Sequence, residues 1–259
     1  MLKKPLLLAM LMAASATQVA FADLHDRGGG MIYDDVLNVT WLQDVNYAMT
    51  SGYDADGMMN WYQATDWAEQ LIYGGHSDWR LPKLTPVNGS SFTYDFSDLH
   101  SGNSDVSWNN SGTNSELGYM YHVNLGNAGS CDTSGLPAGC ETLEDQPGYI
   151  ANFTYNPGPF KNFSRGPDGY TTFWTNTLSP WERDPIESPE AWVFHFTGGG
   201  QDPDWVLNAD NFAWAVRDGD VAAVPEPETY ALMLAGLGLV GFAARRRRHE
   251  SLLDHSIWE

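Results

Sequence analysis

The stretch NWYQATDWAEQLIYGGHSDWRLP, residues 60–82, predicts a helix, a turn and a rigid corner in succession. Asn60 is a residue type that caps helices, and Gln63 stands at the third helical position, where its side chain can complete a capping box. The apolar residues fall at helical spacing on one face, namely Trp61, Ala64, Ala68 and Leu71, widened by Trp67 and Ile72. We expect Gly74 and Gly75 to end this helix in a left-handed conformation.

The corner is the DWRLP sequence that closes the stretch. Pro82 disfavours helical angles at Leu81, so the chain should become extended there. We expect Trp79 and Leu81 to point into a core and Arg80 to point elsewhere. A lone buried guanidinium would be very costly, so we expect Arg80 and Arg217 to pair with carboxylates that link separate segments.

Further strands are predicted on both sides of this stretch. Residues rich in β-branched and aromatic types suggest short strands at 31–33, 36–42, 170–175, 191–197 and 212–217. Trp192 and Phe194 alternate with Val193 and His195, which is typical of a half-buried strand that the following glycines break. Residues 85–169 show few periodic runs and predict a long loop.

The first 22 residues have the order of a secretory signal peptide. Two lysines precede an apolar run, and small residues stand before the expected cleavage position after Ala22. We therefore expect residues 1–22 to be removed and residues 23–223 to form one exported domain.

The C-terminal end reverses this order, with a proline-rich stretch, an apolar segment at 230–244 and an arginine cluster. Its marked residues are Val224, Pro225, Glu226, Pro227, Arg245, Arg246, Arg247 and Arg248. Fifteen helical residues span roughly 22 Å, less than a hydrocarbon core of about 30 Å. We therefore expect a transmembrane helix that anchors the protein in the inner membrane only transiently. The arginines favour the cytoplasmic side, which leaves residues 249–259 as a short cytoplasmic tail.

The exported region is strongly acidic. Residues 23–224 contain 28 of the 33 Asp and Glu residues, because five follow Val224, against seven Lys and Arg residues, for a net charge near −21. Such a charge repels nucleic acid and anionic lipid headgroups, and no basic patch overrides it. We expect no nucleic-acid partner, whereas divalent cations would not be repelled.

Cys131 and Cys140 are the only two cysteines, and they lie in a loop rich in Gly, Ser and Pro. An even pair so placed in an exported chain predicts a disulfide that closes a small loop. A metal site would need further soft ligands nearby, and the sequence shows none.

Asp54 and Asp56 lie close to Gly57 and Asn60. This cluster could hold calcium through oxygen ligands, or it could be a polar loop beside the helix cap. It lacks the ligand order and terminal Glu of the twelve-residue calcium loop, which favours the polar loop. We therefore expect no cofactor, and calcium is the one candidate.

Five motifs together resemble the DUF1566, or Lcl C-terminal, domain: LNVTWL (37–42), GGHSDWRLP (74–82), FWTNT (173–177), AWVF (191–194) and AWAVR (213–217). The family residues carried over as structural are Trp79, Arg80, Leu81, Pro82, Trp174, Trp192 and Arg217. The family's Thr-x-x-Glu-Leu is replaced after Pro82 by KLTP. The resemblance implies an α+β, C-type-lectin-like fold with short antiparallel strands, one or two helices and long loops.

The C-terminal arrangement resembles a PEP-CTERM sorting signal. That resemblance implies cutting by an exosortase in a Gram-negative envelope, after signal peptidase has acted, and delivery to the cell surface or extracellular matrix. It also implies an association with producers of extracellular polysaccharide and biofilm.

The sequence positions of the tryptophans and histidines help to distinguish between classes of function. Six tryptophans stand in periodic or motif positions and should pack in the core: Trp41, Trp61, Trp79, Trp174, Trp192 and Trp214. Three stand in polar loops and could contact a ligand such as a sugar: Trp108, Trp181 and Trp205. No nucleophile, phosphate-loop or zinc motif is present, and the histidines at positions 76, 100, 122 and 195 are far apart in sequence.

We therefore expect a non-enzymatic surface protein that binds a glycan or another envelope component. Two other classes stay open at this point: an enzyme that modifies extracellular polymer, and a purely structural matrix protein.

Overall fold

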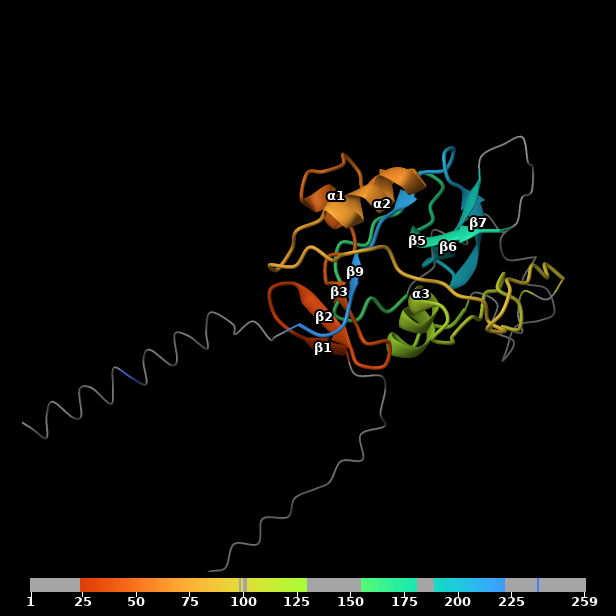
Figure 1. Ribbon diagram of the computed structural model, residues 1–259, viewed down its shortest axis with the longest axis horizontal. Coiled ribbons are helices and arrows are strands. Elements are labelled where there is room, and N and C mark those ends of the chain that lie inside the picture. Colours follow the sequence, from red (N-terminus) through yellow and green to blue (C-terminus); the bar gives the residue numbers. More distant parts are fainter. Residues whose placement is uncertain are drawn as a thin grey trace, which may run out of the picture.

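The computed structural model describes residues 24–97, 99, 102–129, 155–180, 189–221 and 237 of the 259-residue chain. Within these residues strands predominate and helices are few, so the domain is of the α+β kind (Figure 1). The strands are β1 (Leu24–Asp26), β2 (Met31–Asp34), β3 (Val39–Leu42), β4 (Met58–Met59), β5 (Thr172–Ser179), β6 (Glu190–His195), β7 (Gly200–Trp205), β8 (Asn211–Phe212) and β9 (Val216–Asp218). The helices are α1 (Tyr47–Thr50), α2 (Trp61–Gln70), α3 (Glu116–Tyr119) and the π-helical turn η1 (Met120–Asn124).

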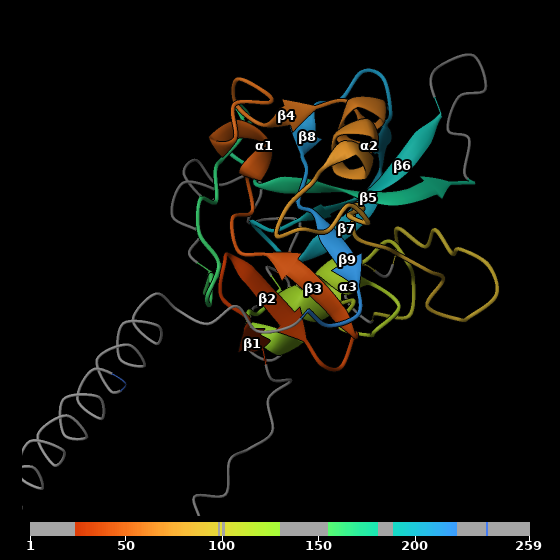
Figure 2. The same ribbon diagram turned by 60° about the vertical axis from the view of Figure 1, so that its left-hand side comes forward.

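The strands form two sheets. One is antiparallel in the order β1-β2-β3-β9, and the other has the order β4-β8-β5-β6-β7 with a single parallel pair between β5 and β8. Figure 2 shows β2, β3 and β9 side by side below the strands of the second sheet. Arg27, just after β1, forms a bidentate ion pair with Asp220, just after β9, with N–O distances of 2.8 and 2.7 Å. Both ends of the described domain are therefore joined at the first sheet.

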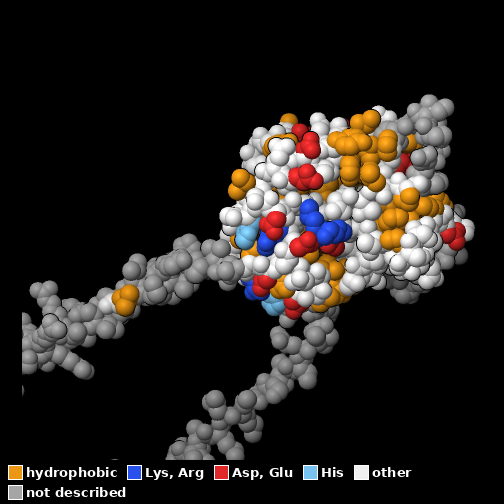
Figure 3. All heavy atoms as spheres, in the orientation of Figure 1, with side chains coloured by type: hydrophobic (Ala, Val, Ile, Leu, Met, Phe, Trp, Pro, Cys, Tyr) orange, Lys and Arg blue, Asp and Glu red, His pale blue; other side chains and the backbone are white. Residues whose placement is uncertain are grey.

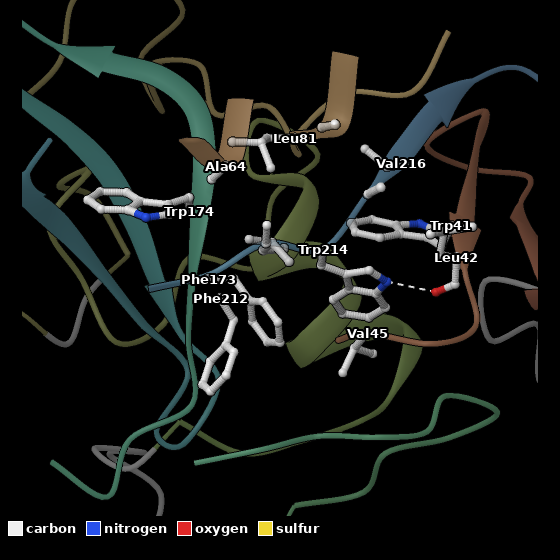
Figure 4. Close-up of a cluster of buried hydrophobic side chains, with 14 of the residues drawn as sticks. Trp41, Leu42, Val45, Ala64, Leu81, Phe173, Trp174, Phe212, Trp214 and Val216 are labelled. Atoms are coloured by element: carbon white, nitrogen blue, oxygen red, sulfur yellow. Dashed lines mark hydrogen bonds between the residues drawn. The ribbon is translucent and has the colours of Figure 1, made fainter. Parts of the chain in front are cut away.

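One segment crosses between the sheets, because β8 pairs in the second sheet and β9 pairs in the first. The sequence predicted a single strand at 212–217, and this was wrong: the fully buried residues 213–215 separate two strands. Trp214 lies at the centre, with its ring 4.7 Å from each of Trp41 and Phe160, and it donates to the carbonyl of Leu42 at 2.8 Å (Figure 4). The crossing segment thus carries the core that both sheets share.

Helix α2 begins as predicted. Asn60 and Gln63 form the reciprocal capping box, and the helix buries Ala64, Trp67 and Ala68. Its end differs from the prediction, because Ile72 is 76% exposed and the helix stops at Gln70.

The glycines expected to end α2 have another role. Gly74 and Gly75 have φ of 60° and 83° and form the tight turn between Tyr73 and His76, which exchange two backbone hydrogen bonds of 3.0 Å. Such positive φ values favour glycine, so the pair closes a turn after the helix rather than capping the helix itself.

The corner is confirmed. Trp79 and Leu81 are buried, and the backbone of Arg80 exchanges two hydrogen bonds of 2.8 and 2.9 Å with Val216 of β9. The carbonyl of Pro82 accepts from the amide of Asn176 in β5 at 2.8 Å. The corner therefore fastens the first sheet to the second.

Strand β6 is buried on both faces rather than half-buried, since residues 191–194 are fully buried. The predicted loop at 85–169 supplies part of the cover, because Phe92 and Tyr94 lie against the ring of Trp192 at 5.0 and 5.5 Å. That segment also contains α3 and η1. The glycines at 198–200 do not end the sheet but lead directly into β7, a strand the sequence did not predict.

Several predictions concern residues outside the described part of the chain: the signal peptide, Cys131 and Cys140, Trp181, His100, and the sorting and membrane segments apart from Leu237. Among the described residues, no helix has both the length and the apolar character needed to cross a bilayer.

Candidate ligand-binding site

A pocket opens beside β7, where the predicted long loop reaches the second sheet. Its volume is about 80 Å³, and it is lined by Phe96, Leu99, Val106, Ser107, Trp108, His195, Gln201 and Asp202. Its wall combines apolar side chains with a carboxylate and an imidazole, and none of the described residues that line it is a Lys or Arg. Small-molecule sites in proteins commonly have this mixture.

Trp108 is held at the pocket by the edge of β7. Ser107 exchanges backbone hydrogen bonds of 3.3 and 2.9 Å with Gln201, so the next side chain, Trp108, lies over Gly200. A Cβ atom at Gly200 would lie 2.3 Å from the indole ring, so only glycine permits this contact. The ring also stacks against His195, with centroids 6.0 Å apart, and is half-buried.

The strand register brings His195 and Asp202 onto one face. Thr172 and Gly200 both pair directly with His195, and Asp202 pairs with Val193, which stands two residues before His195. Directly paired residues point to the same face, so the three side chains meet there. The His195 Nε2 atom lies 2.7 Å from Asp202 Oδ1, and Nδ1 lies 3.0 Å from Thr172 Oγ1.

The charges around the imidazole are mainly negative. Burial on its own would lower the pKa of His195, but the charge of Asp202 and its hydrogen bond raise that pKa above its ordinary value, with smaller contributions from Asp204 and Asp168. The carboxylates therefore outweigh the desolvation of the ring.

The Thr172–His195–Asp202 chain has the residue order of a nucleophile, a base and an acid. Thr172, however, is only 5% exposed and does not line the pocket. Its hydroxyl fixes the orientation of the imidazole instead, so this chain offers groups for recognition and no accessible nucleophile at Thr172.

The polar groups of the wall differ in availability. The Gln201 amide is engaged on both sides, donating to the Asp105 carbonyl and accepting from the Ser115 hydroxyl, each at 2.8 Å. The Ser107 hydroxyl donates to the Leu99 carbonyl at 3.1 Å. Asp202 is different, because its side chain is 40% exposed and its Oδ2 atom has no hydrogen-bond partner within the described parts of the chain.

The tryptophans expected to contact a ligand separate into three cases. Trp108 lines the pocket, whereas Trp205 is half-buried at the far end of β7 and does not, and Trp181 lies outside the described residues. Five of the six expected core tryptophans are at most 2% exposed, as predicted: Trp41, Trp79, Trp174, Trp192 and Trp214. Trp61 is half-buried and donates to the Thr175 carbonyl at 2.8 Å.

The calcium candidates hold a backbone turn. Asp54 Oδ1 accepts from the amides of Asp56 and Gly57 at 3.1 and 2.8 Å, and Asp56 Oδ1 accepts from the Met58 amide at 3.0 Å. Across the described ranges, no three His, Cys, Asp or Glu side chains are grouped so as to hold a metal ion. Calcium binding stays a prediction.

Both arginines expected to form structural links do so. Arg80 pairs with Glu116 through two hydrogen bonds of 2.8 Å and also with Asp218. Arg217 pairs with Asp78 at 2.9 and 2.8 Å. Figure 3 shows the basic side chains of this face gathered in one area with acidic side chains beside them.

His195 and Asp202 were not predicted as a site. His195 was known only as one of several scattered histidines, and Asp202 belongs to a strand that the sequence did not reveal. The one signal that pointed here was Trp108, a large aromatic residue in a polar loop.

Comparison with known proteins finds one match, to the PEP-CTERM protein-sorting motif over residues 223–248. No curated protein and no solved structure matches the chain. The motif implies an exported, exosortase-processed protein that passes through a Gram-negative envelope to the cell surface, with exosortase as the processing partner. Neither a DUF1566 domain nor a C-type-lectin-like fold is supported by a match.

Proposed function

We propose that the exported domain is a non-enzymatic module that binds a glycan of the cell envelope, and that the pocket beside Trp108 is its binding site. The observation that carries this proposal is one pocket lined by both a half-buried indole, Trp108, and the carboxylate of Asp202, whose Oδ2 atom is available. A sugar ring presents an apolar C–H face and hydroxyl donors. The indole suits the first and the carboxylate suits the second.

The rigidity of the pocket supports the same reading. The ring of His195 is hydrogen-bonded at both nitrogens, and Gln201 is fixed by Asp105 and Ser115. A site whose side chains are already ordered loses little conformational entropy when a ligand binds. Sorting to the cell surface also brings the domain to extracellular polysaccharide.

The finer expectations belong to this proposal as well. The motifs that resemble DUF1566, the lectin-like fold they imply, a role in biofilm and the disulfide between Cys131 and Cys140 are consistent with a secreted binding domain. Calcium belongs here only as a possible ligand of the turn at Asp54 and Asp56.

The test is a glycan array probed with the exported protein, with and without calcium, beside two variants. Trp108→Ala should weaken binding about five- to tenfold, since stacking on an aromatic ring contributes on the order of 1–1.5 kcal/mol. Trp205→Ala removes an equally large, half-buried aromatic residue outside the pocket and should leave binding unchanged.

Two outcomes contradict the proposal. One is the absence of glycan binding in both conditions, which would favour a structural matrix protein. The other is undiminished binding by Trp108→Ala, which would place the site elsewhere.

A further inference from the structure

We infer that the sugar recognised by this pocket carries a free amino group, as an ammonium ion. This inference rests on the proposed function of the pocket and names its ligand class more closely. It starts from charge, because the described part of the wall contains Asp202 and His195 but no Lys or Arg.

An anionic sugar does not suit this site. Recognition of a carboxylate or sulfate in a protein commonly uses arginine or lysine. The exported region has only seven such residues, and Arg27, Arg80 and Arg217 are already paired with carboxylates. The net charge near −21 would also repel an anionic polymer.

Carboxylates lie on the His195 side of the pocket. Asp202 Oδ1 is 2.7 Å from the His195 Nε2 atom, and Asp204 and Asp168 also act on the ring electrostatically. A cationic group of a ligand is therefore attracted to this side of the pocket.

The three carboxylates are not arranged as a metal site, since no metal-binding group occurs in the described part of the chain. Two of them have other bonds: Asp204 accepts from the amide of Trp205 and from Asn211, and Asp168 accepts from the amide of Tyr170. Asp202 alone lines the pocket. The negative charge is therefore spread over several positions, and only Asp202 offers a carboxylate for direct contact. This arrangement suits a single ammonium group on a larger molecule.

The pocket offers two attractive interactions to such a group. Asp202 Oδ2 can accept a charge-assisted hydrogen bond, and the face of Trp108 attracts a cation through its ring electrons. Phe96, Leu99 and Val106 line the same pocket, and their apolar side chains lower the local dielectric and strengthen both.

The experiment is calorimetric titration of the exported protein at about pH 6, where sugar amines are charged. Four probes are compared: tetramers of glucosamine, N-acetylglucosamine and glucose, and a tetramer containing glucuronic acid. We expect the glucosamine tetramer to bind at least about tenfold more tightly than the other three, with an affinity that falls as salt is added.

Asp202→Asn should lower the affinity for the glucosamine tetramer more than that for the glucose tetramer, which also loses a carboxylate acceptor, so that the preference for the amine disappears. Asp66→Asn is the matched control, because it removes the same charge from an exposed position on α2, away from the pocket. It should keep the preference.

The outcomes distinguish the two proposals. Equal binding of the glucosamine and N-acetylglucosamine tetramers, or a preference that survives in Asp202→Asn, overturns the amine inference and leaves glycan binding standing. A protein that binds none of the four tetramers, and no glycan on the array, overturns both.

Discussion

Two charged clusters in this domain use the same kinds of side chain in different ways. The corner cluster consists of Arg80, Lys83, Glu116 and Asp218, and the pocket cluster consists of His195, Asp168, Asp202 and Asp204. The first has two cations for two anions and joins the corner to α3 and β9. The second has three carboxylates for one imidazole and borders a pocket.

The difference concerns what each charge can still do. In the corner cluster, Arg80 and Glu116 are 15% and 11% exposed at their side chains and satisfy each other through two hydrogen bonds. In the pocket cluster, Asp202 keeps an oxygen available at 40% exposure. The paired charges of the corner cluster stabilise the fold, whereas the Asp202 carboxylate of the pocket cluster is available to a ligand.

The largest expected effect comes from breaking the balanced cluster. Arg80→Met leaves the carboxylate of Glu116 buried without its main cation, and such a loss lowers the free energy of unfolding by about 3 kcal/mol. Urea denaturation measures this. Lys83→Met is the control, because Lys83 is 45% exposed and its loss should cost less than about 1 kcal/mol. A cost for Arg80→Met as small as that of the control would mean that the cluster does not hold the corner.

A smaller loss should follow from crowding the pocket. In Gly200→Ala the new Cβ collides with the Trp108 ring, and the displacement should cost about 2 kcal/mol of stability and weaken glycan binding together. In the double variant Gly200→Ala/Trp108→Ala the collision is absent, so much of the stability should return while binding stays lost. Additive losses of stability in the double variant would contradict the contact.

The clusters should also respond to pH in opposite directions. Hydrogen bonds from Arg80 hold the pKa of Asp218 below its ordinary value, and Arg217 does the same for Asp78. Their contribution to stability is present above about pH 4, the unfolded value, and is lost as pH falls through the folded value. The pKa of His195 is raised, so its contribution is complete below about pH 6.5 and is lost as pH rises through the folded value.

Asp202→Asn tests this at the pocket, because it removes the main group that raises the pKa of His195. The free energy of unfolding, measured at about pH 6 and at about pH 9, should fall less between these two pH values in the variant than in the natural protein. Asp66→Asn should behave like the natural protein. A pH dependence that is the same in all three proteins would show that the carboxylate is not what stabilises the charged imidazole.

The smallest expected effect concerns the outer ion pair. Arg217→Lys keeps the positive charge but loses the two-pronged contact with Asp78; the side chains of Arg217 and Asp78 are 11% and 56% exposed, so only the carboxylate partner is open to water. We expect a loss of about 0.5 kcal/mol, measured by thermal or urea unfolding. A loss as large as that of Arg80→Met would remove the distinction between buried and exposed pairs.

The contrast between the clusters also explains what the sequence could predict. The capping box at Asn60 and Gln63 depends on residues three apart, and the extended corner depends on Pro82, so both follow from local rules. Pairing of the arginines was predictable from the cost of a lone buried charge, although the identity of each partner was not.

The pocket was not predictable because it depends on β7. The sequence GQDPDW has little strand propensity, and it becomes a strand only by pairing along β6. Without that register, nothing places Asp202 beside His195. The crossing at residues 213–215 was missed for a related reason, since an unbroken apolar run does not show that its two ends belong to different sheets.

The ion pair between Arg27 and Asp220 has a consequence for where the sorting motif leaves the domain relative to the pocket. Figure 1 places β1 and the end of β9 on one side of the molecule and β7 on the other. The chain leaves the described domain toward the sorting motif from Val221, on the side of β9. All described residues that line the pocket precede residue 203, so a cut within the motif at residues 223–248 removes none of them, and the binding site is the same before and after processing.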